Sequence, residues 1–145
     1  MFGCTLPGCV RLWNNVTGAL THTFSGHSGA VTCLAMMADG VSVVSGSEDQ
    51  TLRCWFGKED DADACRCVLT GHKGPVRTVC VLSDGTVVSG GDDAVVRLWS
   101  YADGKMSCAK SLSDHAKQVL HVAPMNGDDA AFVSASADRA VYLWK

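Results

Sequence analysis

The sequence has little charge, no strongly basic region and no long apolar run. Charged residues make up 19% of the 145 residues, and 12 Lys and Arg against 15 Asp and Glu leave a net charge of −3. Proteins that bind nucleic acid or anionic membranes present clustered Lys and Arg, whereas here these residues are scattered. No stretch approaches the ~18 apolar residues of a transmembrane helix. We therefore expect neither a nucleic-acid partner nor a membrane partner.

The amino terminus, MFGCTLPGCVRLW, lacks the basic start and the continuous apolar run of a secretory signal. The chain nevertheless has eight cysteines, an even number that raises the question of disulfides. Without a secretory signal we expect reduced thiols and a cytoplasmic location, with the nucleus as the alternative. Several of the cysteines lie in apolar strand patterns, where Cys acts as a small hydrophobic residue.

Cys65 and Cys67 form a C-x-C pair with another cysteine and a histidine nearby in the sequence. A structural zinc site normally uses two C-x(2–4)-C-like clusters, so we expect no metal and no cofactor. Strand alternation predicts both thiols on one face of a strand, as core or surface thiols. Redox sensing by either thiol stays open, although the acidic residues at 59–61 and 63 disfavour a thiolate.

One string of eleven residues recurs: SGSEDQTLRCW (45–55), SGGDDAVVRLW (89–99) and SASADRAVYLW (134–144). In each copy, Ser precedes Asp by four residues and Trp by ten, and a His stands 17 to 19 residues before the Ser. A fourth Trp, Trp13, closes the related string CVRLW, and successive Trp residues are 42, 44 and 45 residues apart. A fixed period of this length indicates a repeat architecture.

Each repeat predicts four short strands separated by turns such as ADG and SDG. In the unit that contains Trp55, the predicted strands span about 29–37, 41–47, 50–56 and 65–70. No window has a convincing helical period. We therefore expect an all-β chain with one domain, 1–145, whose repeats span about 20–55, 65–99 and 108–144, with a partial repeat at 1–14.

A period of about 40–45 residues that carries GH and ends in Trp resembles the WD40 β-propeller family. The resemblance covers about residues 9–145 and implies a propeller segment of about three four-stranded antiparallel blades. In that family a His, a Ser or Thr, an Asp and a Trp form a buried hydrogen-bonded tetrad in a blade. The matching structural tetrads are His27–Ser45–Asp49–Trp55, His72–Ser89–Asp93–Trp99 and His115–Ser134–Asp138–Trp144.

The chemistry of these four side chains suits mutual satisfaction. A neutral His has one donor and one acceptor nitrogen, a hydroxyl both donates and accepts, and Trp donates one N–H. The first unit departs from the pattern, because Gly3 and Pro7 stand where the Ser and Asp would be. His115 follows Asp114 instead of Gly. We therefore expect three intact tetrads and none around Trp13.

The number of repeats bears on ring closure. Closed propellers typically have roughly 4–8 blades, and the chain supplies three repeats and a partial one. We expect an incomplete ring, either as part of a longer propeller or as half of a homodimeric six-bladed ring. In the second case residues 20–25, an outer strand, would complete the last unit of a neighbouring copy, which lacks such a strand.

The Ser, His and Asp content raises the question of a hydrolase. A catalytic triad occurs once and presents an exposed nucleophile, whereas here the set occurs three times, each with a Trp and without a G-x-S-x-G elbow. We therefore expect no catalytic residues and a protein–protein interaction scaffold or adaptor. The alternative is a regulatory or substrate-recruiting module of a larger enzyme or ligase complex.

The family resemblance implies that partners bind at one rim, the top. The contact positions lie just after the His loop and just before the tetrad Asp. By motif these positions are Ala30, Thr32, Glu48, Pro75, Arg77, Asp92, Gln118, Leu120 and Ala137. Their mixed charge does not name a ligand, and Arg77 and Asp92 belong to one unit and are expected to pair.

Overall fold

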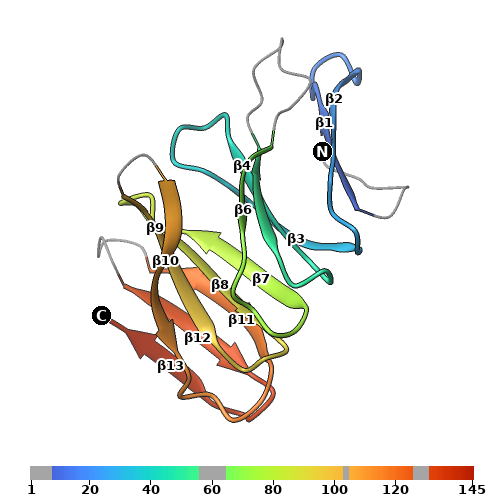
Figure 1. Cartoon of the computed structure of the whole chain (residues 1–145). Helices are drawn as coiled ribbons and strands as arrows, with labels where there is room; N and C mark the ends of the chain where they lie inside the picture. The colour runs from blue at the N-terminus through green and yellow to red at the C-terminus, as the bar shows by residue number, and fades with distance from the viewer. Residues whose placement is uncertain (1–7, 56–64, 103–104, 126–130) are drawn as a thin grey trace.

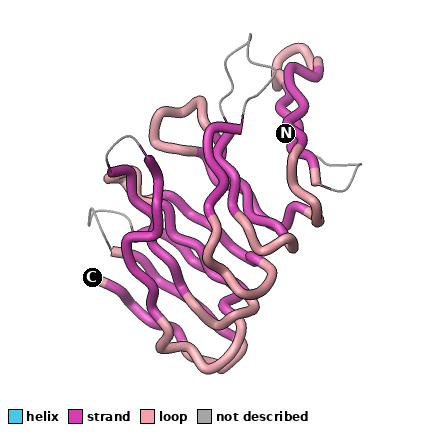
Figure 2. The backbone as a smooth tube through the Cα atoms, viewed as in Figure 1, coloured by secondary structure: helices cyan, strands magenta, loops and turns pink. Residues whose placement is uncertain are grey.

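The computed structural model describes residues 8–55, 65–102, 105–125 and 131–145. These residues form thirteen strands and no helix (Figure 2), which confirms the all-β prediction. Within the described ranges, accordingly, no helix is long and apolar enough to cross a membrane. The predicted departures at Gly3 and Pro7 and the acidic positions 59–61 and 63 lie outside the described residues.

The strands pair with their neighbours in chain order and form four antiparallel sheets (Figure 1). A hairpin of β1 (Cys9–Trp13) and β2 (Leu20–Ser25) comes first. The second sheet contains β3 (Val31–Met36), β4 (Val43–Ser47), β5 (Leu52–Trp55) and β6 (Cys65–Leu69). The third contains β7 (Val76–Val81), β8 (Val87–Gly91), β9 (Val96–Ala102) and β10 (Lys105–Leu112). The last contains β11 (Val119–Pro124), β12 (Phe132–Ser136) and β13 (Val141–Trp144).

Burial differs between the inner and outer strands of a sheet. Every residue of β4 (VVSGS) and of β8 (VVSGG) is buried, because neighbouring sheets cover both faces of these strands. Most of the outer strand β10 is exposed. Both Val positions of β4 and β8 contribute to the core although they point to opposite faces. Strands that are covered on both faces lose the polar–apolar alternation that a half-buried strand shows.

Tight turns connect β3 to β4 and β7 to β8. Asp39 accepts hydrogen bonds from the backbone N–H groups of Val41 (2.9 Å) and Ser42 (2.7 Å). Asp84 accepts the corresponding bond from the Thr86 N–H at 2.8 Å. The Gly that follows each Asp has a positive φ, 68° at Gly40 and 87° at Gly85, which explains the recurring Asp-Gly of the turn strings.

The sheets pack face to face, and three apolar clusters lie between them. One cluster includes Val10, Phe24 and Trp55 and joins the hairpin to the second sheet. Another includes Leu52, Val76 and Trp99 and joins the second sheet to the third, and a similar cluster joins the third to the fourth.

Glycines permit this close stacking at one strand position. A Cβ on Gly46 would lie 2.7 Å from Cγ1 of Val76, which belongs to the next sheet. A Cβ on Gly90 would collide with Val119 in the same way. The third repeat has Ala135 at this position, and no described sheet packs beyond β11–β13. The Gly after the tetrad Ser therefore recurs where the next sheet packs too closely to leave room for a side chain.

The last sheet is three-stranded, as expected for a last unit without an outer strand, and the two sheets before it have four strands each. One expectation needs correction. Residues 20–25 are not a spare strand for a second copy, because β2 is already hydrogen-bonded to β1. The hairpin and the last sheet lie at opposite ends of the arc (Figure 1), and the described sheets do not close a ring.

We predict that Gly46→Ala and Gly90→Ala each lower the free energy of unfolding by about 1–3 kcal/mol, because the added methyl overpacks the contact between sheets. Ala135→Ser is the matched control: it also adds one heavy atom at this strand position, and we expect a change within ~0.5 kcal/mol. Urea unfolding of the three variants and the parent measures these differences. Equal effects in all three variants would show that stacking does not select the glycines.

Candidate functional site

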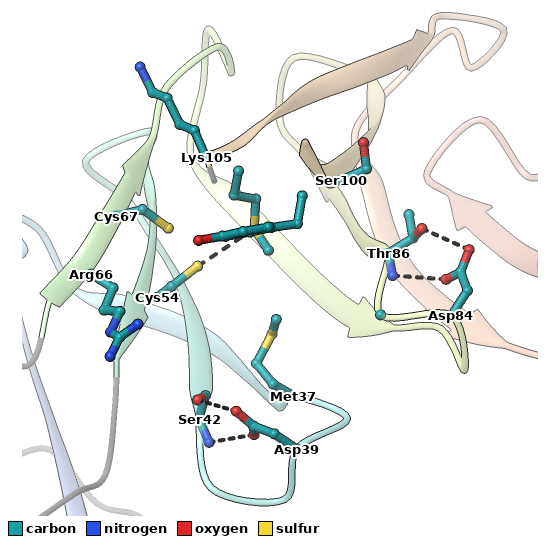
Figure 3. Close-up of a pocket in the computed structure, with 13 residues that line it drawn as sticks. Met37, Asp39, Ser42, Cys54, Arg66, Cys67, Asp84, Thr86, Ser100 and Lys105 are labelled. Carbon is teal, nitrogen blue, oxygen red and sulfur yellow. Dashed lines mark hydrogen bonds between the residues drawn. The ribbon is translucent and has the colours of Figure 1, made fainter. Parts of the chain in front are cut away.

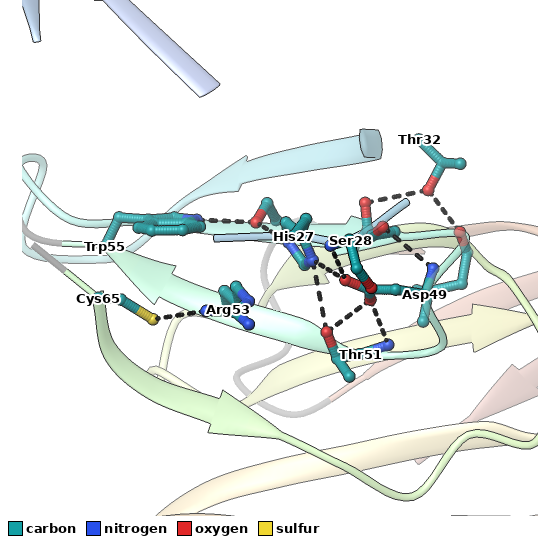
Figure 4. A network of polar contacts seen from close by, with 12 residues as sticks. His27, Ser28, Thr32, Asp49, Thr51, Arg53, Trp55 and Cys65 are labelled. Atoms are coloured by element: carbon teal, nitrogen blue, oxygen red, sulfur yellow. Dashed lines mark hydrogen bonds and ion pairs between the residues drawn. The ribbon is translucent and has the colours of Figure 1, made fainter. Parts of the chain in front are cut away.

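The first tetrad joins a loop, two strands and the turn between them. Nδ1 of His27 lies 2.8 Å from Oδ2 of Asp49, and Nε2 of the same ring lies 2.8 Å from Oγ of Ser45. Nε1 of Trp55 donates to the same Ser45 Oγ at 2.8 Å (Figure 4). Ser45 lies on β4 and Trp55 on β5, so the hydroxyl links neighbouring strands to the loop that precedes β3.

The second and third tetrads repeat this geometry. Nε2 of His72 lies 2.8 Å from Ser89 Oγ, and Trp99 Nε1 donates to that oxygen at 2.9 Å. In the third set the equivalent distances, from His115 and Trp144 to Ser134, are both 2.8 Å. The carboxylates of Asp93 and Asp138 each lie 2.9 Å from Nδ1 of their His. The structure thus brings together all twelve residues that the repeat pattern groups into tetrads.

The direction of the hydrogen bonds follows from the chemistry of each group. A carboxylate only accepts, so His27 Nδ1 carries a proton and donates it to Asp49. Nε2 of the neutral ring then accepts from the Ser45 hydroxyl, whose oxygen in turn accepts from Trp55. Burial lowers the pKa of His27 below its ordinary 6.5, against the opposing effect of Asp49. The ring is therefore neutral near pH 7.

The tetrad Asp also holds the turn between two strands. Oδ1 of Asp49 accepts from the backbone N–H of Thr51 at 2.9 Å, and this bond spans Gln50, whose φ is 70°. Ala94 and Arg139 have φ values of 61° and 73° at the same position of their repeats. Because residues other than glycine rarely adopt a positive φ, the carboxylate stabilises a turn that these side chains disfavour.

Hydrogen bonding outweighs burial in setting the charge of these carboxylates. Burial raises the pKa of Asp49, but hydrogen bonds from Thr51 and His27 lower it more strongly, to about 2. Burial likewise raises the pKa of Asp93, and the hydrogen bonds from His72 and the Lys73 N–H bring it to about 2. Both side chains are charged at neutral pH.

The Ser–His–Asp geometry superficially matches that of a hydrolase triad, but the oxygen is inaccessible. Ser45, Ser89 and Ser134 each have 0% of their surface exposed, and each Oγ already accepts from a Trp N–H. A nucleophilic serine must present its oxygen to a substrate next to an oxyanion hole. These three hydroxyls act inside the sheets as structural links.

The rim positions predicted in each repeat lie next to each other. The Glu48 N–H donates to the Ala30 carbonyl oxygen at 2.9 Å. The matching bonds are Asp92 N–H to Pro75 at 2.9 Å and Ala137 N–H to Gln118 at 3.0 Å. Thus, in each of the last three sheets, the start of its first strand lies next to the turn that precedes the tetrad Asp.

Three charged rim residues form a cluster across two sheets. Arg77 donates through Nε (2.8 Å) and Nη2 (2.6 Å) to the two carboxylate oxygens of Asp92. Its Nη1 lies 3.9 Å from Oε1 of Glu48, which belongs to the preceding sheet. Hydrogen bonding by Arg77 lowers the pKa of Asp92. The structure therefore pairs Arg77 with Asp92, and it also brings Glu48 to the pair.

Thr32 and Leu120 occupy the strand position equivalent to Arg77 but differ in environment. The Thr32 hydroxyl hydrogen-bonds to backbone carbonyls at Gly46 and Val76, so it links two sheets. Leu120 is exposed, with 54% of its surface accessible. The predicted rim positions include charged residues at the second and third sheets and only uncharged residues at the fourth.

A residue that the repeat pattern did not identify covers each tetrad. The guanidinium carbon of Arg53 lies 6.0 Å from the centre of the Trp55 ring, and Tyr142 lies over His115 with ring centres 4.6 Å apart. Arg or Tyr stands two residues before every Trp of the chain. That recurrence was the available signal for this position.

The described residues contain no group of three or more His, Cys, Asp and Glu side chains that could hold a metal ion. Cys65 and Cys67 do not share a face, contrary to the expectation from alternation. Their register against β5 shifts between Cys54 and Trp55, and Cys65 packs with the cluster around Trp55 while Cys67 packs with the cluster on the opposite side. A β-bulge of this kind reverses the alternation of side chains.

Comparison with known proteins confirms the resemblance. The family model described as WD domain, G-beta repeat matches residues 18–55, 63–100 and 106–145. The DENN domain and WD repeat-containing protein SCD1 of Arabidopsis thaliana is 29% identical over 135 residues, which are 92% of this chain and 11% of that protein. The ribosome biogenesis protein YTM1 of Candida glabrata is 30% identical over 131 residues, 79% of this chain and 28% of that protein. This chain thus spans a minor part of each relative's length.

A solved structure supports the fold. A chain in the crystal structure of the mitotic checkpoint complex superposes with a TM-score of 0.85, covering 95% of this chain and 43% of that one. The sequence identity is 23%, so this likeness concerns the fold alone.

We predict that Ser89→Ala lowers the free energy of unfolding by about 1–3 kcal/mol, because it leaves buried His72 and Trp99 nitrogens without a partner. Trp99→Phe removes only the indole N–H that donates to Ser89 and keeps an aromatic ring at this position. The double variant should then be less destabilised than the sum of the two single variants, which urea unfolding measures as a coupling energy. Ser107→Ala on the exposed strand β10 is the control, and additive effects of the first two changes would contradict the shared hydrogen bond.

We predict that acidification destabilises the protein in two ranges. The pKa of His27 is below 6.5 in the folded protein, so its contribution is present above that pH and is lost as the pH falls through the folded pKa. Asp49 and Asp93 have folded pKa values of about 2 against an ordinary 3.8, so their stabilisation is lost as the pH falls from about 4 towards 2.

Urea midpoints measured over this pH range test the prediction, with Asp93→Asn as the comparison. The variant should be less stable near pH 7 and should lose less stability below pH 4 than the parent does. Parallel curves for the parent and the variant would show that Asp93 carries none of the acid sensitivity.

Proposed function

Because this chain belongs to the WD40-repeat family, we propose that it is a protein–protein interaction scaffold or adaptor that carries out no catalysis itself. The WD40 propeller fold generally serves as a non-catalytic interaction scaffold. The burial of Ser45, Ser89 and Ser134 supports the same proposal, because it leaves these residues no role at the surface.

The charged cluster of Glu48, Arg77 and Asp92 is the observation that carries the proposal. The three side chains remain exposed to different degrees, 51% for Glu48, 38% for Arg77 and 21% for Asp92. An exposed ion pair contributes little to stability, so folding alone gives little reason to place these charges together. Groups held in a fixed arrangement at a surface favour recognition of a partner with complementary charge.

We infer that the partner-binding surface is the rim formed by the nine predicted positions: Ala30, Thr32, Glu48, Pro75, Arg77, Asp92, Gln118, Leu120 and Ala137. Exposed Leu120 lies at the uncharged end of this surface, and the ion cluster lies at the charged end. A peptide or domain that presents both an apolar side chain and charged side chains suits this rim. Thr32 contributes mainly by fixing the two sheets, because its hydroxyl is already bonded to backbone.

The remaining partner expectations follow from composition and coverage. A net charge of −3 gives no electrostatic basis for nucleic-acid or membrane binding. We propose the cytoplasm as the location, with the nucleus as the alternative.

We propose that residues 1–145 act as one domain. The small share of each relative that the chain spans favours a second candidate, an interaction module within a longer protein. Homodimerisation stays a prediction.

We predict that Arg77→Glu abolishes capture of the partners without loss of fold, because it places a third carboxylate beside Glu48 and Asp92. Lys110→Glu makes the same charge change on the exposed outer strand β10, away from the rim, and should retain them. Quantitative affinity purification from cells that express each tagged variant measures the captured proteins. Thermal melting followed by circular dichroism verifies that both variants fold.

An unchanged set of captured proteins in Arg77→Glu would place the binding surface elsewhere. Failure of the parent itself to capture any protein above the background of an empty tag would contradict the scaffold proposal as a whole.

A further inference from the structure

A pair of facing cysteines lies between the second and third sheets. Cys54 on β5 is paired in register with Cys67 on β6. Directly opposed residues of an antiparallel pair have Cα atoms about 4.5–5.5 Å apart, which lies within the range of disulfide bonds. Cys67 belongs to the regular part of this register, and both residues pack with the cluster between the two sheets.

The two thiols line a cavity of about 580 Å³. Its wall consists of residues from the β3–β4 turn, β5 and β6 on one side and from the β7–β8 turn, β9 and β10 on the other. Figure 3 shows the sulfur atoms of Cys54 and Cys67 directed into this space from neighbouring strands. Sγ of Cys54 also lies 3.8 Å from the thioether sulfur of Met106. A small solute therefore has room to reach the thiols.

We propose that Cys54 and Cys67 form a peroxide-reactive modification site that closes to a cross-strand disulfide. The Cys67 thiolate attacks one oxygen of hydrogen peroxide, which breaks the O–O bond and gives Cys67 sulfenic acid and hydroxide. The Cys54 sulfur then attacks the sulfenic sulfur, and the S–O bond breaks with release of water. Overall, two thiols are oxidised by two electrons, and one peroxide is reduced to two waters.

The environments of the two thiols assign their roles. Contact with the Cys54 thiol lowers the pKa of Cys67, against the opposing effect of burial. The same contact, together with burial, raises the pKa of Cys54. Since the thiolate is the reactive form, half-buried Cys67 attacks peroxide, and buried Cys54 resolves the sulfenic acid.

Other cysteines serve as internal references. Burial raises the pKa of Cys33 to about 11 and that of Cys80 to about 12, so both are protonated at neutral pH. Cys108 is the exposed cysteine on β10, where it contacts the Lys110 carbonyl. Cys65 lies two residues from Cys67 on the same strand but packs on the opposite face.

The test treats the reduced full chain with hydrogen peroxide near pH 7, blocks remaining thiols by alkylation and identifies modified peptides by mass spectrometry. Because the pKa of Cys67 is lowered, more of this thiol is ionised there than of an ordinary Cys. We therefore expect Cys67 to be consumed severalfold faster than Cys108, with Cys54 lost at the same rate and the two peptides recovered as one disulfide-linked species.

Variants separate the two steps. Cys54→Ser should leave a Cys67 sulfenic acid that a 1,3-dione reagent traps, and Cys67→Ser should protect Cys54 from oxidation. Cys65→Ser is the matched control and should react as the parent does. The proposal is overturned if Cys108 or Cys65 reacts first in the parent chain, or if Cys54 and Cys67 are oxidised without a bond between them; these outcomes require no variant to fold.

Discussion

Every complete repeat of this protein depends on one serine hydroxyl that serves two buried rings. The hydroxyl of Ser89 accepts from Trp99 and donates to His72, which in turn donates to Asp93. The bonds tie together the loop that enters the sheet, an inner strand, the next strand and the turn between the two. Because all of these groups are buried, loss of one bond leaves its partner unsatisfied in a low-dielectric environment. The charged Asp then also supports a turn residue with positive φ.

The stacking of sheets imposes a second constraint, which acts on the residue beside each serine. Gly46 and Gly90 meet a valine of the next sheet, whereas Ala135 lies in the last sheet, beyond which no described sheet packs. The tetrad thus holds the strands and the turn of one sheet together, and the glycine permits close packing between that sheet and the next. Together they leave two features that packing does not explain: an exposed ion cluster at the rim and a cavity lined by thiols.

Both features arise where residues from different strands or sheets meet. Glu48 approaches Arg77 because the backbone bonds of two consecutive turns hold both at the same end of stacked sheets. Cys67 faces Cys54 because the two are directly opposed in the pairing of β5 with β6, and the register shift that follows this pair places Cys65 on the other face. The rim gives the scaffold proposal its surface, and the cavity gives the chain a chemistry that the family resemblance does not imply.

The sequence by itself determined the strands, the repeat period and the grouping of residues such as His27, Ser45, Asp49 and Trp55. These follow from the two-residue period of strands and from short turns, which fix how residues within one sheet face each other. Only the tertiary structure decided that β2 pairs with β1, that Cys65 and Cys67 lie on opposite faces, and that Glu48 reaches Arg77. The physical reason is that a bulge shifts the register without a distinct sequence signal, and that contacts between sheets depend on how whole sheets stack.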